Sequence, residues 1–109
     1  MKHKITLPQL KKYDITQKVI AALADAESRS IIFSITRKGK TATNLSQLLK
    51  IPLSSVYKKL TDLENLSLIK IEKTVLSENG KRFKIYKSRI NKAEITIKKP
   101  EPTLSLSSN

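Results

Sequence analysis

Apolar side chains recur every three to four residues in four segments of the chain, and this spacing is typical of amphipathic helices that each bury one face. It predicts helices over residues 15–24 and about 28–38, and two shorter helices between Thr41 and Leu66. The predicted buried positions are Val19, Ile20 and Leu23; Ile31, Ile32 and Ile35; Leu45, Leu48 and Leu49; and Val56, Leu60 and Leu63. Because each helix hides only one stripe, the helices must pack against one another.

Polar residues mark the expected ends of the first two helices. Asp14, followed three residues later by Gln17, has the spacing of a capping box at the start of the helix over 15–24. Gly39 stands where a glycine commonly ends a helix, so it predicts the end of the second helix near Lys38. Phe33 lies off the main stripe of this second helix, on a second contact face.

The two helices between Thr41 and Leu66 have the length and spacing of a helix-turn-helix motif, which joins two short helices by about three or four residues. Either Thr41 or Thr43 caps the first helix, and Pro52 ends it, because the residue before a proline is disfavoured in a helix. Serine oxygens are expected to cap the second helix, which begins between Pro52 and Ser54. Its polar and basic face, of the size that reads a DNA groove, consists of Ser54, Ser55, Tyr57, Lys58 and Thr61.

After Leu66 the apolar period changes to two, which predicts strands over residues 68–75 and 81–87. Asn79-Gly80 between them is a strong hairpin signal. Residues 93–98 alternate as well and predict a third strand, with a short last helix as the alternative. The expected fold is therefore α+β: a winged helix-turn-helix of three to four helices followed by a β-hairpin wing, with room for an extra C-terminal strand.

This fold is expected to occupy residues 14–98. Residues 1–13 form a basic N-terminal arm, which is either flexible or packs Ile5, Leu7 and Leu10 on a partner subunit. Residues 99–109 are rich in proline and serine and predict a disordered tail. No apolar run approaches the roughly 20 residues that span a bilayer, and the N-terminus lacks the apolar core of a secretory signal, so a cytoplasmic protein is expected.

The net charge of +13 favours a polyanionic partner. It is concentrated on residues 37–92, which carry 14 Lys and Arg against four Asp and Glu. The chain contains no cysteine, which excludes disulfides and thiolate metal sites, and its one histidine, His3, predicts no metal site. No nucleophile–base pair or phosphate-cradling loop is present, so neither an enzyme nor a cofactor is expected.

Four segments resemble the ArsR-type family of winged-helix regulators. Residues 23–32 (LADAESRSII) resemble that family's LADPTRRRIL opening, and residues 54–60 (SSVYKKL) resemble its QSTVSRHL recognition helix. Leu66-Ser67-Leu68-Ile69 stands where the family has AGLV, and residues 82–86 stand at its second wing strand. The resemblance covers about residues 14–90, and MarR-like and other regulators share the same pattern.

The resemblance implies a homodimeric transcriptional regulator that binds a pseudo-palindromic operator in double-stranded DNA. Ser54, Ser55, Tyr57 and Lys58 match the family's base-reading positions, while Lys81, Arg82 and Lys84 match its wing. The chain departs from the family in three ways: it lacks the sensory cysteines of metal-responsive members, Pro52 replaces a small polar cap, and Tyr57 replaces a small residue. Tyr57 therefore packs either into the core or against a DNA sugar.

The predicted DNA-binding residues are Thr43, Ser54, Ser55, Tyr57, Lys58, Lys59, Thr61, Lys81, Arg82 and Lys84. Serine and lysine can contact base edges and phosphates in the major groove. Lys59 either reaches a phosphate or lies along the core, and the wing cations suit phosphates or the minor groove. Two other functions stay open: a winged-helix module that binds protein in the transcription machinery, and a non-specific, chromatin-like DNA binder.

Overall fold

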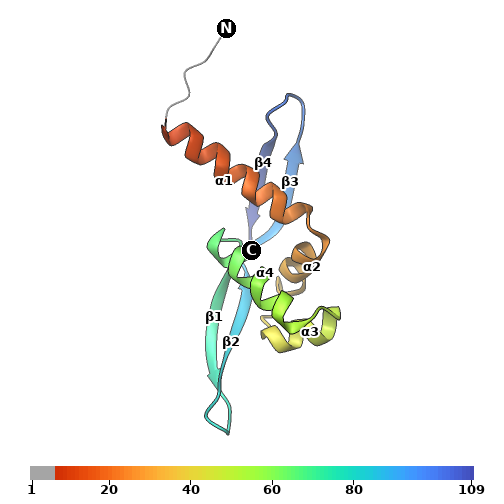
Figure 1. Ribbon diagram of the computed structural model, residues 1–109, viewed down its shortest axis with the longest axis vertical. Coiled ribbons are helices and arrows are strands. Elements are labelled where there is room, and N and C mark those ends of the chain that lie inside the picture. The colour runs from red at the N-terminus through yellow and green to blue at the C-terminus, as the bar shows by residue number, and fades with distance from the viewer. Residues whose placement is uncertain (1–6) are drawn as a thin grey trace.

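The computed structural model describes the backbone of residues 7–109 and the side chains from Asp14 onward, and it confirms the predicted α+β winged-helix architecture (Figure 1). Four helices precede two separate antiparallel hairpins, β1–β2 and β3–β4. The elements are α1 (Leu7–Ala24), α2 (Ala26–Ser34), α3 (Ala42–Leu49), α4 (Leu53–Asn65), β1 (Ile69–Leu76), β2 (Arg82–Ser88), β3 (Ile90–Thr96) and β4 (Thr103–Ser108).

The core lies where α2, α3 and α4 meet the inner ends of the two hairpins. Its buried apolar residues are Val19, Leu23, Ile31, Ile32, Ile35, Ala42, Leu45, Ile51, Val56, Leu60, Leu63, Leu68, Ile69, Tyr86 and Ile90. Nine of the twelve helical positions predicted to be buried are in this cluster. Leu48 is 58% exposed, and Ile20 and Leu49 are half-buried, so these three predicted positions lie outside the buried cluster.

Helix α1 begins at Leu7, so the predicted capping box at Asp14 is wrong. Asp14 lies inside the helix and pairs with Lys18 one turn later, at 3.1 Å. Pro8 does not prevent this earlier start, because a proline in the first turn gives up an N–H that has no partner in the helix. Residues 1–6 of the predicted arm, including Ile5, lie outside the described residues. In the described part of the chain, no helix is long and apolar enough to cross a membrane.

Helix α2 ends at Ser34, four residues before the predicted end. The Asp25 carboxylate caps its start by accepting from the backbone N–H of Ser28 at 3.0 Å. Gly39 does not end the helix. It allows the backbone to pass close to β2, because a Cβ at this position would stand 2.6 Å from Cγ2 of Ile85. The segment after α2 can therefore lie directly against the wing.

The turn between α3 and α4 is built by backbone geometry rather than by serine caps. Thr41 caps α3 through a capping box with Asn44, which settles the choice between Thr41 and Thr43. Lys50 ends α3 in the left-handed conformation, with φ of 55°. Pro52 is the N-cap of α4 and makes no side-chain capping bond, so the predicted serine caps are wrong.

The β1–β2 hairpin is the predicted wing, and it projects from the body at one end of the molecule (Figure 1). Gly80, at φ of 79°, forms the tight turn at its tip. Lys40 and Tyr86 exchange backbone hydrogen bonds of 3.1 and 2.8 Å, which add the α2–α3 link to the side of β2. The orientation of the wing is thereby fixed to the helix-turn-helix.

Residues 99–109 are not a disordered tail, because Thr103–Ser108 form β4 and pair antiparallel with β3. The strand predicted near residues 93–98 is confirmed as β3, Ile90–Thr96, and the alternative of a last helix is wrong. The side-chain amide of Asn109 donates to the carbonyl oxygens of Thr36 and Ser88, at 2.8 and 2.9 Å. These hydrogen bonds anchor the residue after β4 to the segment after α2 and to the end of β2.

Candidate nucleic-acid interface

The packing of α4 determines which of its side chains face outward. Val56, Leu60 and Leu63 are buried against the core, so the opposite face of the helix is presented to solvent. Ser54, Tyr57, Lys58 and Thr61 are the exposed members of this face. Tyr57 is 51% exposed, which excludes its packing into the core. The exposed Thr61 hydroxyl donates to the backbone carbonyl of Tyr57 at 3.0 Å, and its oxygen can still accept a further hydrogen bond.

A hollow of about 280 Å³ lies between this face of α4, the start of α3 and strand β2. Five of the predicted DNA-binding residues line it together: Thr43, Tyr57, Thr61, Arg82 and Lys84. The fold thus brings the helix-turn-helix and the wing to one surface, although their residues are far apart in the chain. Sequence reasoning missed Glu64 and Phe83, which also line the hollow. Glu64 follows Tyr57 at helical spacing, and this signal was available in the sequence.

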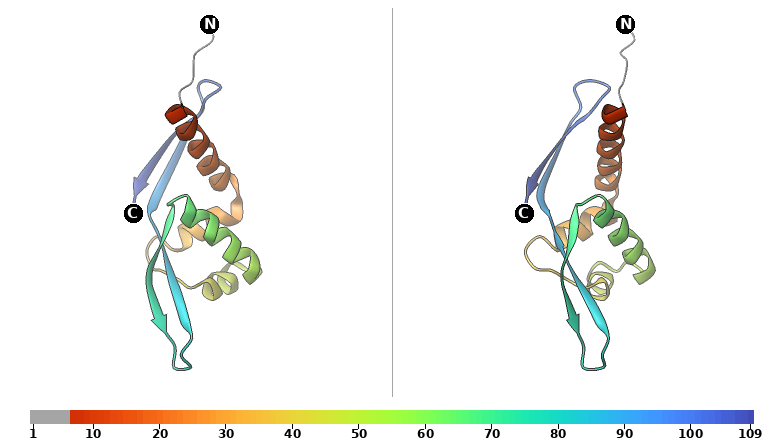
Figure 2. Two further views of the ribbon diagram at one scale, coloured as in Figure 1. Left: turned by 60° about the vertical axis from the view of Figure 1, so that its left-hand side comes forward. Right: turned by 90° about the vertical axis from the view of Figure 1, so that its left-hand side faces the viewer.

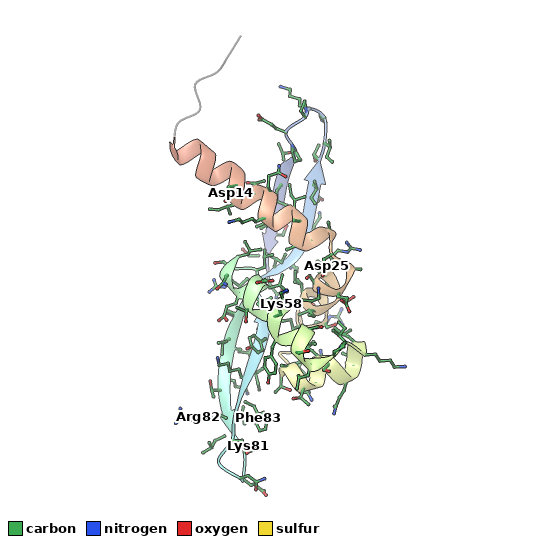
Figure 3. All side chains as sticks on the ribbon, viewed as in Figure 1. Asp14, Asp25, Lys58, Lys81, Arg82 and Phe83 are labelled. Carbon is green, nitrogen blue, oxygen red and sulfur yellow. The ribbon has the colours of Figure 1, made fainter. Side chains whose placement is uncertain are left out.

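The wing cations extend this surface away from the body. Lys81, Arg82 and Lys84 are all exposed, and Lys81 and Arg82 lie at the far end of the hairpin (Figure 3). The backbone N–H of Lys81 donates to the Ser77 hydroxyl at 3.1 Å, which holds the start of β2 against the turn. Exposed cations on a projecting hairpin suit phosphate groups, because they can approach a backbone without burying their own charge.

The N-terminus of α4 offers a second kind of phosphate contact. No side chain of the described residues accepts a capping hydrogen bond from its first turn, since Pro52 has no capping oxygen. The free backbone N–H groups there can donate to an anion, and the helix dipole favours negative charge at the same place. The sequence did not predict these free N–H groups, because serine side chains were expected to cap them.

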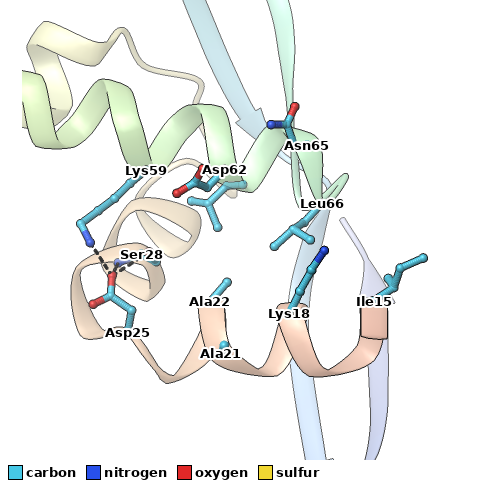
Figure 4. A pocket seen from close by; sticks show the side chains of 11 residues that line it. Ile15, Lys18, Ala21, Ala22, Asp25, Ser28, Lys59, Asp62, Asn65 and Leu66 are labelled. Atoms are coloured by element: carbon cyan, nitrogen blue, oxygen red, sulfur yellow. Dashed lines mark hydrogen bonds and ion pairs between the residues drawn. The ribbon is translucent and has the colours of Figure 1, made fainter. Parts of the chain in front are cut away.

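Lys59 is placed away from this surface. Its ammonium donates to the Asp25 carboxylate at 2.8 Å (Figure 4). It also lies 3.8 Å from the Glu27 carboxylate. The hydrogen bonds from Lys59 and Ser28 lower the pKa of Asp25 to about 2, and the bond to Asp25 raises the pKa of Lys59. Both groups are charged at neutral pH and tie α4 to the start of α2. Ser55 is half-buried, so it is also a weaker candidate for DNA contact than Ser54.

A buried tyrosine also lines the hollow. Tyr86 lies at the back of the hollow, 7% exposed, and burial raises the pKa of its hydroxyl. Among the side chains that the structure describes, no three His, Cys, Asp or Glu residues are grouped so as to hold a metal ion. The surface around the hollow carries basic, hydroxyl-bearing and aromatic side chains, and it spans α3, α4 and β2.

The comparisons with known proteins support the fold. No protein-family model matches the sequence, and no curated protein matches it. Among solved structures, the chain is similar to NolR from Sinorhizobium fredii, with a TM-score of 0.61 at 15% sequence identity. The similarity covers 80% of this chain and 81% of that one. Four helices followed by a hairpin wing are therefore a winged-helix fold, which this chain shares with NolR across most of its length.

Proposed function

We propose that this chain binds double-stranded DNA sequence-specifically as a homodimeric transcriptional regulator of the ArsR-like type. The observation that carries the proposal is the shared surface of α4 and the wing, where the predicted helix and wing residues meet around one hollow. A recognition helix of 13 residues has the size that enters a major groove of about 12 Å. The winged-helix fold shared with NolR is consistent with this role.

Each part of the surface has a distinct task in this proposal. Ser54, Tyr57, Lys58 and Thr61 face the base edges, where the lysine suits guanine and the threonine methyl and tyrosine ring suit the thymine methyl group. Lys81, Arg82 and Lys84 contact the backbone or the adjacent minor groove, and the free N–H groups of α4 hold a phosphate. Lys59 is left out of the proposed site, because Asp25 already holds its ammonium.

Fluorescence anisotropy with labelled duplex DNA tests the proposal, with salt varied from about 50 to 200 mM. We expect affinity to fall steeply with salt, and selection from random duplexes to enrich one two-fold symmetric motif. Lys58→Gln should weaken binding, whereas Lys18→Gln, a matched change at an exposed lysine of α1, should not. Salt-steep binding without an enriched motif would leave a non-specific DNA binder. Absence of binding at low salt would overturn the proposal in favour of a protein-interaction module.

A further inference from the structure

The wing carries different side chains on its two faces where it joins the body. On the inner face, Ile69 lies directly opposite Ser88, and both are buried. The next opposed pair along the ladder is Lys70 and Lys87. Because successive side chains of a strand point to opposite faces, these two lysines lie on the outer face, away from the core.

The opposed pair of Lys70 and Lys87 is electrostatically unfavourable in the protein alone. Directly opposed side chains of an antiparallel ladder have Cβ atoms about 4.5–5.5 Å apart, and like charges there destabilise the pair. The Lys87 ammonium is also restrained, because it donates to the backbone carbonyl of Arg37. A carbonyl oxygen satisfies the hydrogen bond but does not neutralise the charge. An anion bound at this face would relieve the repulsion.

The strands place further cations on the same side. Arg89 follows Lys87 by two residues, which is the spacing of side chains on one face of a strand, and it is exposed. Lys73, also exposed, lies directly opposite Ile85, which precedes Lys87 by two residues. The positive charge therefore extends along the outer face in both directions from the opposed lysines.

The link between α2 and α3 adds two more cations beside these strands. Lys40 of the link exchanges backbone hydrogen bonds with Tyr86, so the link lies next to the base of the wing (Figure 2). Arg37 and Lys38 of the link are exposed, and the bond from the Lys87 ammonium holds this segment at the edge of the outer face. The outer basic face consists of Arg37, Lys38, Lys70, Lys73, Lys87 and Arg89.

The protein's own acids do not balance the outer basic face. Glu72, at the bulge, is the only acid in strands β1 and β2. Its carboxylate would stand 3.4 Å from a Cβ at Gly39, so it lies beside the link. The lysines that form ion pairs among the described side chains all lie elsewhere, and they are Lys18, Lys59 and Lys92.

This distribution of charge fits the sugar–phosphate backbone of duplex DNA. A duplex carries one negative charge per about 1.7 Å of its axis, and exposed lysine and arginine side chains neutralise several of these phosphates together. Proteins that hold single strands add aromatic side chains on which the bases stack. Phe83 is the one aromatic residue that strand alternation places on this face of β1 and β2. The face therefore suits a duplex better than a single strand.

We infer that the outer basic face binds the backbone of a second DNA duplex, so that the protein can hold two duplex segments together. Arg82 and Lys84, which belong to the DNA-binding surface proposed above, share the inner face with Tyr86 by strand alternation. A duplex on that surface lies on the opposite side of the wing from the outer basic face. The inference rests on the proposed function for the first duplex and adds a surface for another.

A capture assay tests the inference. One duplex is fixed to beads, the protein is added at about 50 mM salt, and the capture of a second, fluorescent duplex is measured. We expect the wild type to capture it, and Lys38→Gln/Lys70→Gln/Lys73→Gln to capture at least tenfold less. The affinity of this variant for a single duplex, measured by anisotropy, should change less than capture does.

The matched control for capture is Lys92→Gln/Lys98→Gln/Lys99→Gln, which removes three positive charges from the C-terminal hairpin. It should capture the second duplex as the wild type does. Equal losses in the two variants would overturn the inference, because net charge alone would then explain capture. Undiminished capture by the outer-face variant would also overturn it, since the second duplex would then bind elsewhere.

Lysine acetylation of the wild type, read by mass spectrometry, tests the same surface without a variant. As duplex is added, Lys58 on α4 should be protected first, and Lys70 and Lys73 only with further duplex. Protection of Lys58 alone, even with excess duplex, would overturn the inference and leave the proposed function in place. Protection of Lys70 and Lys73 alone would overturn the proposed function, so the two failures can be told apart. Stronger protection by single-stranded DNA or by RNA would overturn the assignment of a duplex DNA partner.

Discussion

The two hairpins have the same backbone architecture but differ in the charge of their side chains. Each is a two-stranded antiparallel ribbon with one register shift near its inner end. Residues 69–88, which hold the wing, carry six Lys and Arg against two Glu, whereas residues 90–109 carry three Lys against two Glu. Their tips differ too, with Asn79-Gly80 in the wing and Pro100-Glu101-Pro102 in the other hairpin. The two hairpins thus share one backbone motif and differ in net charge, which is +4 for residues 69–88 and +1 for residues 90–109.

The chain passes from one hairpin to the other through a buried, pinned connection. The backbone N–H of Ser88 donates to the Ile35 carbonyl at 2.9 Å, and the Ser88 hydroxyl donates to the Ile90 carbonyl at 2.6 Å. Ser88 is 2% exposed, and no buried polar side-chain atom of the described residues lacks a partner. Both hairpins are therefore anchored to one core through this shared connection.

Removing the wing charge should have the largest effect on DNA binding. The triple variant Lys81→Gln/Arg82→Gln/Lys84→Gln is expected to lower affinity about a hundredfold or more near physiological salt. The log–log salt slope should become shallower by about 0.9 for each phosphate that the variant no longer neutralises. The matched control, Lys92→Gln/Lys98→Gln/Lys99→Gln, removes the same number of positive charges from the C-terminal hairpin. Equal decreases in affinity in the two variants, measured by anisotropy, would contradict the division of labour between the hairpins.

The part of the fold that sequence reasoning could predict is the part with local signals. The stripe of α4, the threonine cap of α3 (Thr41 or Thr43) and the Asn79-Gly80 turn each depend on residues within a few positions of one another. The wing strands follow from alternation in the same way. Local spacing therefore predicted most of the surface around the hollow.

The rest depends on contacts that are distant in the sequence. Leu104 and Leu106 alternate with polar residues, which is a weak strand signal in a segment of six residues that follows two prolines. Strand β4 can be identified only when its pairing with β3 is known. Lys59 looks like a free lysine until Asp25, 34 residues away, is placed beside it. Gly39 resembles a helix stop, because nothing local shows that Ile85 lies against it.

Gly39→Ala should disturb the wing and leave the C-terminal hairpin unchanged. Its added Cβ would meet Cγ2 of Ile85 at 2.6 Å and the Tyr86 carbonyl oxygen at 3.0 Å, so β2 must shift. We expect a loss of about 1–3 kcal/mol in the free energy of unfolding, as for other overpacked sites. Urea denaturation measures it, with exposed Lys38→Ala as the control. An unchanged dimer mass in both variants would show that the effect stays at the wing.

Gly80→Ala tests the tip of the wing, where the constraint is conformational. Gly80 has φ of 79° and no atom within 4 Å of an added Cβ, so only the backbone preference is changed. A left-handed alanine costs about 1–2 kcal/mol, which should appear in urea denaturation. Gly80→Asn is the matched control, because asparagine tolerates this region better, and it should recover part of the loss. Equal losses in the two variants would argue against this cause.

A smaller effect is expected outside both hairpins, at the ion pair between Asp25 and Lys59. Because the folded protein holds the pKa of Asp25 at about 2, below the usual 3.8, its contribution to stability is complete above the usual pKa. It is lost as the pH falls from about 4 towards 2. Asp25→Asn should therefore unfold at lower temperature than the wild type at pH 7, and the difference should shrink in that acidic window.

The Asp25 variant also serves as a reference for both hairpins. Asp25 and Lys59 are partly exposed, at 42% and 23% of their side chains, so solvent weakens the pair and the change should be modest. Asp14→Asn, which breaks a pair exposed by more than 60% on both sides, should change the melting temperature less. DNA affinity and dimer mass should stay at wild-type values in both variants. A large loss of DNA binding in Asp25→Asn alone would contradict this expectation. It would mean that the Asp25–Lys59 pair controls the position of α4, and with it the DNA-binding surface.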